Sequence, residues 1–374
     1  ISSDSWPIYI SLQKDGILFK MRRTQDLPDK ESATMFFQDC KLSHQAQITG
    51  ISHSVKEIFP PDLLDLTQLQ KEANIRYGYT ASEVYDIAQS LYEKKLISYP
   101  RTSSRYLTED VFDSLSPIMA RLLSWELFPA AKGTGGIDIS SLSRHVISAE
   151  KANVHHAIII TGIRPGNLSE KEMQVYRLVA GRMLETFMAP CRIETTNVEA
   201  VCGAQHFKAE QTRIIEAGWH DVFMRSDMIP TSGYSVKELP EVEKGDTLNV
   251  CGCNMVHKKQ LPVNPFTDAE LVEYMEQKGL GTVSSRTNII RTLVNRKYIR
   301  YSGRYIIPTP KGMFTYETIR GKKIADTLLT ADWEKQLAGL ESGMITGQDF
   351  LNRIRTLAKE MTDDIFNTYS TKEE

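Results

Sequence analysis

The sequence predicts an α+β, multidomain protein, on three observations. The chain has 374 residues, enough for two to four compact domains. Residues 1–60 alternate apolar and polar positions as antiparallel strands do, and residues 61–190 are mostly helical in periodicity. Strand-like alternation returns over residues 191–257. The β part is therefore expected to be discontinuous, split by a helical insertion.

Composition places the chain among ordinary globular proteins. Charged residues make up 25% and hydrophobic residues 41%, and no apolar run is long enough to cross a membrane. The five cysteines are an odd number without metal-ligand spacing. We expect a reduced, cytoplasmic protein with no membrane partner and no zinc. The chain begins at Ile1, within an apparent strand, so we expect a piece of a longer protein.

Two helices and an extended segment are predicted after residue 60. Thr67 and Gln70 have capping-box spacing and open a helix to about Tyr77, and Thr80 and Glu83 open a second helix. One face of the second helix is predicted to be buried, through Val84, Ile87, Ala88, Leu91 and Lys95. The extended LISYPRT that follows is predicted to open a hairpin, and the whole is the outline of a winged helix-turn-helix.

The same outline recurs downstream. Thr267 and Glu270 cap a helix, a Gly-Leu-Gly turn follows, a second helix runs over about 284–296, and a hairpin has Ser302 and Gly303 at its tip. With a constant offset of 202 residues, seven of twenty positions are identical: Thr80/Thr282, Ser82/Ser284, Ile87/Ile289, Leu91/Leu293, Lys95/Lys297, Ile97/Ile299 and Tyr99/Tyr301. The sequence thus predicts two copies of one module, with chance similarity between amphipathic helices as the alternative.

Two other segments carry structural expectations. The Gly-rich run at 132–136 is expected to be a surface loop, and the tail from Thr330 to be helical. In that tail, near-helical spacing predicts that four residues pack in a core: Trp333, Leu337, Leu340 and Met344.

Positive charge is concentrated in one region. The formal net charge of the chain is −2, yet residues 284–323 contain ten Lys/Arg and a single acid, Glu317. A local positive surface is what a phosphate backbone requires. A solvated basic face without a partner is the alternative.

The run LISYPRTSSRYL contains a candidate nucleophile, Tyr99. A phenol has a pKa near ~10, so it attacks a phosphate only when cations stabilise the phenolate and the phosphate. Arg101 projects to the same side as Tyr99 in an extended segment and can contact a phosphate with two donors, and Pro100 fixes the backbone between them. The alternative is a packing tyrosine in a wing.

Five segments resemble the type IA DNA topoisomerases, especially the topoisomerase III branch. They are LLDLTQLQKEANIRYGYTA, LYEKKLISYPRTSSRYL, HHAIIITG, PFTDAELVEYMEQKGLGTVSSRTNIIRTL and YIIPTPKG, with a weaker TADWEKQLAGLESG. They cover roughly residues 60–345 in the order found in the family. A match of this extent is far more specific than YPRT alone.

The resemblance implies an activity and its site residues. Tyr99 would form a 5′-phosphotyrosine on single-stranded DNA with help from Arg101, while Ser98 and Arg105 would contact DNA. Ser103 stands where the family usually has an acid. Resealing would need no ATP, and the sequence has no GxxxxGK[ST] loop.

Two further motifs add candidates by resemblance. HHAIIITG is similar to the family's HxAIxPT box, which selects His155 as a proton carrier; a structural hydrogen-bonding histidine is the alternative. GLGTVSSRTNII is similar to GIGTPATRAAII, which places Ser284, Ser285 and Arg286 at a helix N-terminus facing DNA phosphate; an ordinary capped helix is the alternative.

The resemblance also implies a toroid with a central hole for DNA. Residues 1–60 and 191–257 would form a β arch, 61–190 a helical gate domain that carries Tyr99, and 258–374 a winged-helix-like base. The family binds Mg²⁺ on an N-terminal Toprim domain with an Asp-x-Asp motif, which does not occur in this chain. We therefore expect this chain to bind no metal itself and to need its Toprim domain as a partner.

Three hypotheses remain open from the sequence. The first is the DNA-gate part of a topoisomerase, which alone would bind single-stranded DNA but cleave it poorly. The second is a non-enzymatic winged-helix DNA-binding protein that binds duplex DNA through its recognition helices. The third is an inactive clamp or scaffold descended from the family.

Overall fold

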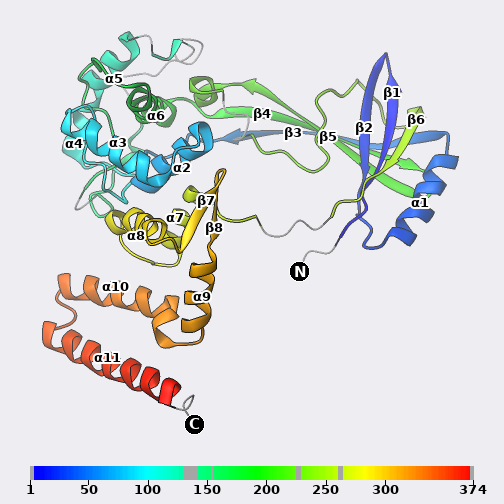
Figure 1. The fold of residues 1–374 in the computed structure, drawn as a ribbon. Helices are drawn as coiled ribbons and strands as arrows, with labels where there is room; N and C mark the ends of the chain where they lie inside the picture. The colour runs from blue at the N-terminus through cyan, green and yellow to red at the C-terminus, as the bar shows by residue number, and fades with distance from the viewer. Residues whose placement is uncertain are drawn as a thin grey trace. The chain divides into compact units, whose positions relative to one another are not determined.

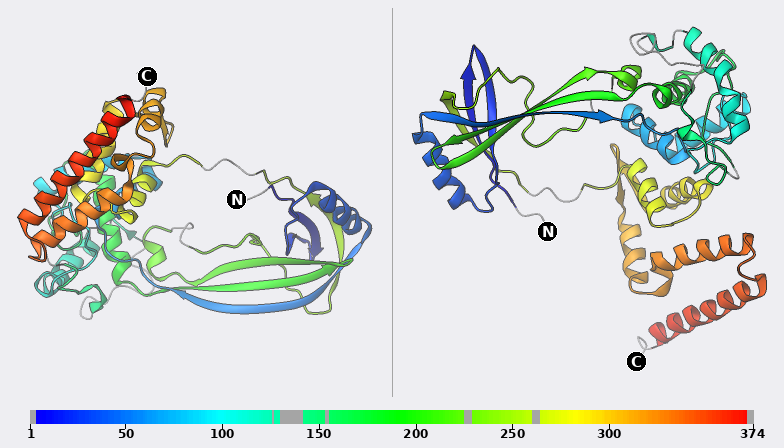
Figure 2. Two further views of the ribbon diagram at one scale, coloured as in Figure 1. Left: turned by 90° about the horizontal axis from the view of Figure 1, so that it is seen from below. Right: turned by 180° about the vertical axis from the view of Figure 1, so that it is seen from behind.

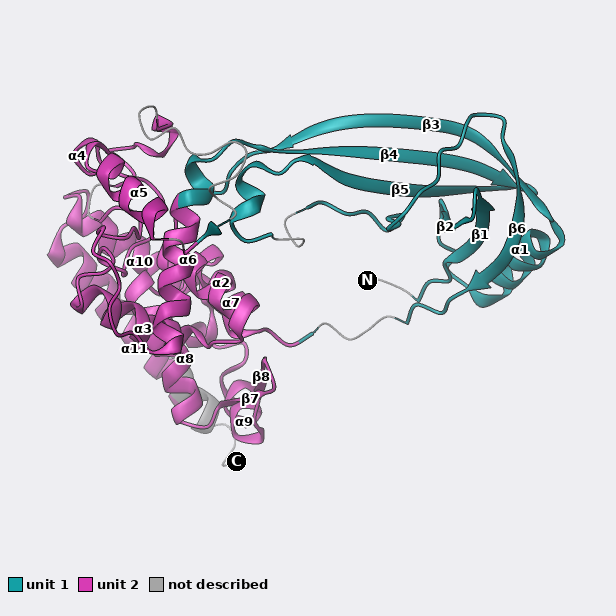
Figure 3. Ribbon diagram, turned by 90° about the horizontal axis from the view of Figure 1, so that it is seen from above, with its two compact units in different colours: residues 1–61, 128–138, 184–264 teal, residues 62–127, 139–183, 265–374 magenta. Residues whose placement is uncertain are grey.

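A computed structural model gives the fold and describes residues 4–125, 127–129, 142–152, 155–224, 229–259 and 264–370. The Gly-rich run at 132–136 lies outside the described residues. The chain divides into two compact units (Figure 3): residues 1–61, 128–138 and 184–264 form unit 1, and residues 62–127, 139–183 and 265–374 form unit 2. The predicted gate and base segments thus fall largely within one compact unit.

Unit 1 is built on antiparallel strands. Its elements are β1 (Ile8–Lys14), β2 (Ile17–Arg23), α1 (Lys30–Leu42), β3 (Gln45–Ile58), β4 (Cys191–Cys202), β5 (Gln205–Glu216) and β6 (Thr247–Met255). The six strands close into a barrel in the order β1-β2-β5-β4-β3-β6. β3, β4 and β5 also continue beyond the barrel as a long ribbon (Figures 1 and 2).

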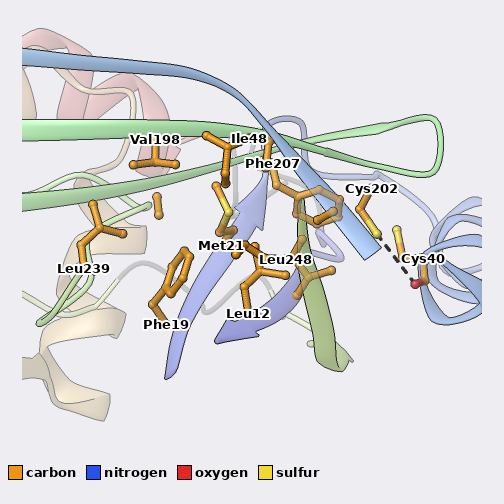
Figure 4. Close-up of a cluster of buried hydrophobic side chains, with 14 of the residues drawn as sticks. Leu12, Phe19, Met21, Cys40, Ile48, Val198, Cys202, Phe207, Leu239 and Leu248 are labelled. Carbon is orange, nitrogen blue, oxygen red and sulfur yellow. Dashed lines mark hydrogen bonds between the residues drawn. The ribbon is translucent and has the colours of Figure 1, made fainter. Parts of the chain in front are cut away.

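The barrel core follows from the period-2 pattern of the strands. On β1, Ile8, Ile10 and Leu12 are fully buried while the residues between them are not. Side chains from all six strands and α1 fill the interior (Figure 4). Successive side chains of a strand face opposite sides of the sheet, so the alternation in the sequence leads directly to this core.

One helix of unit 1 differs from the predicted sheet. Residues 30–42, expected to be strand, form α1, whose N-terminus is capped by the Asp29 carboxylate accepting from the Ser32 N–H at 2.7 Å. Only Ala33 and Cys40 of this helix are fully buried. The prediction failed because a helix with so few buried residues has no clear apolar stripe.

Unit 2 is helical except for one hairpin. Its elements are α2 (Leu66–Tyr77), α3 (Ala81–Glu93), α4 (Glu109–Asp113), α5 (Leu115–Ser124), α6 (Glu170–Phe187, its last turn in unit 1), α7 (Asp268–Gln277), α8 (Val283–Asn295), β7 (Ile299–Ser302), β8 (Tyr305–Pro308), α9 (Pro310–Ile319), α10 (Thr327–Glu341) and α11 (Gly347–Ser370). Over the described ranges, no helix is long and apolar enough to cross a membrane.

The helix caps are partly as predicted. The capping boxes at Thr80 and at Thr267 are confirmed. The one predicted at Thr67 is wrong, because α2 already begins at Leu66 and is capped by Asp65, whose carboxylate accepts from the Gln68 N–H at 2.7 Å. Thr67 is instead a buried residue of the first turn.

The predicted duplication is visible in the backbone. We call residues 64–99 with 157–161 repeat 1, and residues 266–309 repeat 2. Each repeat has two helices, and in each the second helix is followed by a lysine, Lys95 or Lys297, with a φ of 60°. Such a left-handed lysine is uncommon. The sequence predicted that Lys95 extends the buried face of the second helix. That prediction is wrong, because Lys95 lies where the helix ends.

The wings of the two repeats close in the same way. In repeat 2, β7 and β8 form a hairpin, and the Thr309 hydroxyl donates to the Lys297 carbonyl at 2.6 Å. In repeat 1 the Thr161 hydroxyl donates to the Lys95 carbonyl, also at 2.6 Å. The second wing segment of repeat 1 is thus residues 157–161, separated from the first by an insertion that carries α4 and α5. The predicted hairpin directly after α3 is wrong for this reason.

The predicted core role of the C-terminal tail is only partly met. The tail is helical, as α10 and α11, but Leu337 is 43% exposed and Met344 is 80% exposed. Trp333 and Leu340 are half-buried. Helical spacing identifies a common face, but it does not supply a partner for that face.

We predict that Gly218→Ala destabilises unit 1 by roughly 3 kcal/mol in urea unfolding, because alanine is strained at positive φ and a close overlap adds to that strain. Gly218 has φ 52°, and an added Cβ would overlap the carbonyl oxygens of Ala189 and Pro190. Gly16→Ala is the control: Gly16 has φ 83° with no atom near the added Cβ, so only the strain of roughly 1 kcal/mol applies. Equal losses in the two variants would contradict the overlap.

Candidate functional site beside Tyr99

The segment that carries Tyr99 is fixed to residues 157–159 through Ser98. The Ser98 N–H donates to the Ile159 carbonyl at 2.8 Å, and its hydroxyl donates to the Ala157 carbonyl at 3.0 Å. The same hydroxyl accepts from the Ile159 N–H at 2.9 Å. These three bonds hold the backbone next to Tyr99 in an extended conformation. Ser98 therefore has an internal role, and its predicted contact with DNA stays a prediction.

Tyr99 lies between two rings. Its ring centroid is 4.5 Å from that of His155 and 5.3 Å from that of Tyr92, which meets it edge-on. His155 is exposed, and its carbonyl accepts from the Thr102 hydroxyl at 3.0 Å. The structure thus brings together the predicted nucleophile and the predicted proton carrier, and Tyr92 is an additional contact.

Arg101 is held against α3. Its guanidinium lies over the Tyr85 ring, 5.0 Å from the ring centroid, and its Nη2 donates to the Gln89 side-chain oxygen at 3.3 Å. Its Nε is buried and has no hydrogen-bond partner among the described residues. A buried donor without an acceptor costs about 1–3 kcal/mol.

Arg101 opens onto a polar groove of about 530 Å³ between α3 and α8. The groove is lined by Tyr85, Arg101, Ser284, Ser285, Asn288, Ile289, Thr292 and Leu293. Two of the predicted helix N-terminal residues, Ser284 and Ser285, therefore share a surface with Arg101. Hydroxyls, a helix N-terminus and one guanidinium suit an anionic ligand that also has hydrogen-bonding and apolar parts.

Two predicted DNA contacts have internal partners instead. Arg286 is 8% exposed, and its Nη1 lies 3.1 Å from Glu276. The Arg105 Nε lies 2.7 Å from Asp65, the cap of α2. Both guanidinium groups hold helix ends in place in this structure, and their contacts with DNA stay predictions.

Eight of the ten basic residues in the predicted basic stretch fall into two groups. Arg286, Arg291, Arg320 and Lys323 form ion pairs with Glu276, Asp86, Glu317 and Glu360. A second group is exposed after α8 and on the hairpin: Arg296, Lys297, Arg300 and Arg304. Exposed cations such as those of the second group are available to phosphate.

A buried carboxylate links the two repeats. Asp268, 1% exposed, accepts a hydrogen bond from the Ala81 N–H at the start of α3 and another, at 2.9 Å, from the Tyr301 hydroxyl. Burial raises the pKa of Asp268, these two hydrogen bonds lower it, and the nearby Glu83 raises it, with a net upward shift. Burial and the adjacent Asp268 also raise the pKa of Tyr301.

Further polar contacts join the repeats at mostly half-buried positions. Arg291 of α8 donates from Nε to the Ser82 hydroxyl at 2.7 Å, and its Nη2 lies 2.8 Å from Asp86. Lys71 of α2 pairs with Glu273 of α7 at 2.8 Å. α3 is therefore attached to repeat 2 along its first two turns.

The described residues contain no cluster of the usual metal-binding side chains. No group of three or more His, Cys, Asp or Glu that could hold a metal ion occurs among them.

The residues around Arg101 and Tyr99 were not singled out from the sequence. Tyr85, Gln89 and Tyr92 lie at i, i+4 and i+7 on α3, beside its buried face. A polar and aromatic stripe at helical spacing, directly before the candidate segment, is the signal that would have found them.

We predict that the stability of Asp268→Asn relative to the wild type rises with pH. A carboxylate with a raised folded pKa contributes stability below its unfolded pKa, and that stability is lost as pH rises through the folded pKa. The wild type should therefore lose stability relative to the variant as pH rises from below 3.8, the ordinary value, through the raised pKa of Asp268. Urea unfolding of both proteins across this pH range measures the difference in their stability. A difference that does not change with pH would contradict the raised pKa of Asp268.

Comparison with known proteins identifies the family. The family model described as DNA topoisomerase matches residues 1–352. The chain is 32% identical over 344 residues to a protein named DNA topoisomerase 3 from Bacillus licheniformis, covering 86% of this chain and 47% of that protein. A protein of the same name from Bacillus subtilis is 30% identical over 352 residues, covering 87% of this chain and 48% of the relative.

A solved structure shows the same fold. Full-length topoisomerase I from Thermotoga maritima aligns with a TM-score of 0.71 at 23% identity, over 96% of this chain and 59% of that chain. The chain spans about half the length of the curated relatives it matches. From its helices, its barrel and the family match over residues 1–352, the chain belongs to the DNA topoisomerase family.

Proposed function

We propose that this chain is the DNA-gate part of an ATP-independent type IA topoisomerase of the topoisomerase III kind, acting on single-stranded DNA in the cytoplasm. The observation that carries the proposal is the placement of Tyr99 beside His155, two residues from an arginine that opens onto a polar groove. The family match and the relatives named DNA topoisomerase 3 support it.

The proposed reaction conserves the phosphodiester bond energy. The Tyr99 hydroxyl oxygen attacks a DNA phosphorus and forms a 5′-phosphotyrosine, while the bond to the 3′ oxygen breaks and that oxygen leaves as a 3′ hydroxyl. His155, whose ring lies beside that of Tyr99, carries the proton released by the phenol to the departing 3′ oxygen. Arg101 donates to the phosphate oxygens as negative charge develops on them. The reverse attack by the 3′ hydroxyl reseals the strand without ATP.

The remainder of such a protein would supply what the described residues do not. We propose, following the sequence resemblance, that magnesium is held on a Toprim domain, which is the partner of this chain. This chain alone then binds single-stranded DNA and cleaves it poorly.

The domain roles follow the sequence resemblance. We propose that residues 1–60 and 191–257 act as a β arch, 61–190 as a gate domain and 258–374 as a winged-helix-like base in a toroid around DNA. The barrel with its long ribbon and the two helix-helix-wing repeats are compatible with these roles.

We predict that Tyr99→Phe abolishes the covalent adduct with a labelled single-stranded oligonucleotide when the chain is supplied with the Toprim domain and Mg²⁺, because only the phenol oxygen can bond to phosphorus. Denaturing gel electrophoresis detects the adduct. Tyr301→Phe is the matched control: the equivalent tyrosine of repeat 2 donates to Asp268 and should leave the adduct in place.

Three outcomes separate the hypotheses. An adduct that persists in Tyr99→Phe would refute the proposed nucleophile. DNA binding without any adduct in the complemented wild type would favour a clamp or scaffold. Duplex preference without an adduct would favour a winged-helix DNA-binding protein.

A further inference from the structure

The Arg101 side chain is held by residues outside its own segment. Both of its side-chain contacts, to Tyr85 and Gln89, come from α3, one helical turn apart on the same face. Gln89 is itself oriented, because its side-chain nitrogen donates to the Glu93 carboxylate at 2.8 Å. The Gln89 amide therefore presents its oxygen, and not its nitrogen, to Arg101.

We propose that Tyr85 and Gln89 are positioning residues that hold the Arg101 guanidinium ready for a phosphate of bound DNA. The inference rests on the proposed function and deepens it by naming residues that act through Arg101. Neither residue would contact the reacting atoms. Both would fix the plane of the guanidinium so that its unused N–H groups face the groove between α3 and α8.

The physical gain is preorganisation of a long side chain. A free arginine loses rotamer entropy when it is fixed in one geometry. A contact with an aromatic face and a hydrogen bond each contribute favourably at a partly exposed site. Together these contacts can offset most of that entropy before DNA arrives, so the affinity for phosphate rises without a new contact to DNA.

The contacts are not explained by core packing. Tyr85 and Gln89 are half-buried, whereas the core of α3 is formed by a different face, through Ala81, Val84, Ala88 and Leu91. Arg101 also lines the groove between α3 and α8, so a ligand in that groove can reach its side chain after both contacts are made.

The duplication supplies an internal control. At the constant offset, Thr287 and Arg291 of repeat 2 stand in place of Tyr85 and Gln89, and Gly303 stands in place of Arg101. Arg291 there pairs with Asp86 of α3. Repeat 2, which has no arginine at the position of Arg101, also lacks counterparts of Tyr85 and Gln89. Its second helix and the cap of that helix are retained.

The test is a double-mutant cycle on oligonucleotide affinity, measured with this chain and a short single-stranded oligonucleotide by fluorescence anisotropy. Arg101→Ala should raise Kd about tenfold, and Tyr85→Leu and Gln89→Met should each raise it about threefold, as expected when preorganisation of one charged contact is lost. In the Arg101→Ala background, Tyr85→Leu and Gln89→Met should have no further effect. Tyr85→Phe, which keeps the ring, should behave as the wild type.

Matched controls report on general effects of these substitutions. Gln336→Met on α10 and Tyr316→Leu on α9 should leave Kd unchanged, since neither residue lines the groove. If Tyr85→Leu and Gln89→Met lower the affinity for the oligonucleotide equally in the wild type and in the Arg101→Ala background, the proposal is overturned. A merely structural role acts whether or not the arginine is present. An unchanged Kd in Arg101→Ala would also overturn it.

The cycle reads DNA affinity and not cleavage, so its result is separate from that of the covalent-adduct experiment. If no adduct forms but the effects of Tyr85→Leu and Gln89→Met on Kd still depend on Arg101, the proposed reaction is rejected and the positioning of Arg101 is supported. If the adduct forms normally but these effects on Kd are the same with and without Arg101, only the positioning is rejected.

Discussion

The hydrogen bond from the Ala81 N–H to the buried Asp268 carboxylate is the contact on which the site most depends. It joins repeat 2 to the N-terminus of α3, where the helix dipole favours negative charge. The same helix then carries Tyr85, Gln89 and Tyr92, which contact Arg101 and Tyr99. A displacement of α3 would therefore move both the candidate nucleophile and its arginine relative to the groove residues of α8.

Most of the contacts that join repeat 1 to repeat 2 are polar. The buried hydrophobic cluster of repeat 2 takes only Ala81 from repeat 1, while the remaining contacts named above are hydrogen bonds and ion pairs. Exposed ion pairs contribute about 0–1 kcal/mol each, and a buried carboxylate without a cation opposes its own burial. These polar contacts, together with the contact of Ala81, hold the two repeats together.

The two tyrosines of the duplication show how neighbours decide chemistry. Tyr301 is half-buried, and its hydroxyl is committed to Asp268, which together with burial raises its pKa. Tyr99 has the equivalent position in repeat 1, but its ring lies beside the exposed His155. The backbone is shared, so the difference comes from the side chains that the rest of the unit places around each ring.

The sequence by itself predicted antiparallel strands over residues 1–60 and 191–257, the capping boxes at Thr80 and Thr267 and the duplication, and it singled out Tyr99 as a candidate nucleophile, because these depend on local periodicity or on short motifs. Only the tertiary structure decided that Arg286 and Arg105 pair internally, that the wing of repeat 1 is completed by residues 157–161, and that Tyr85 and Gln89 hold Arg101. The physical reason is that a charge or a strand edge takes whichever partner the fold brings near, and sequence spacing does not specify that partner.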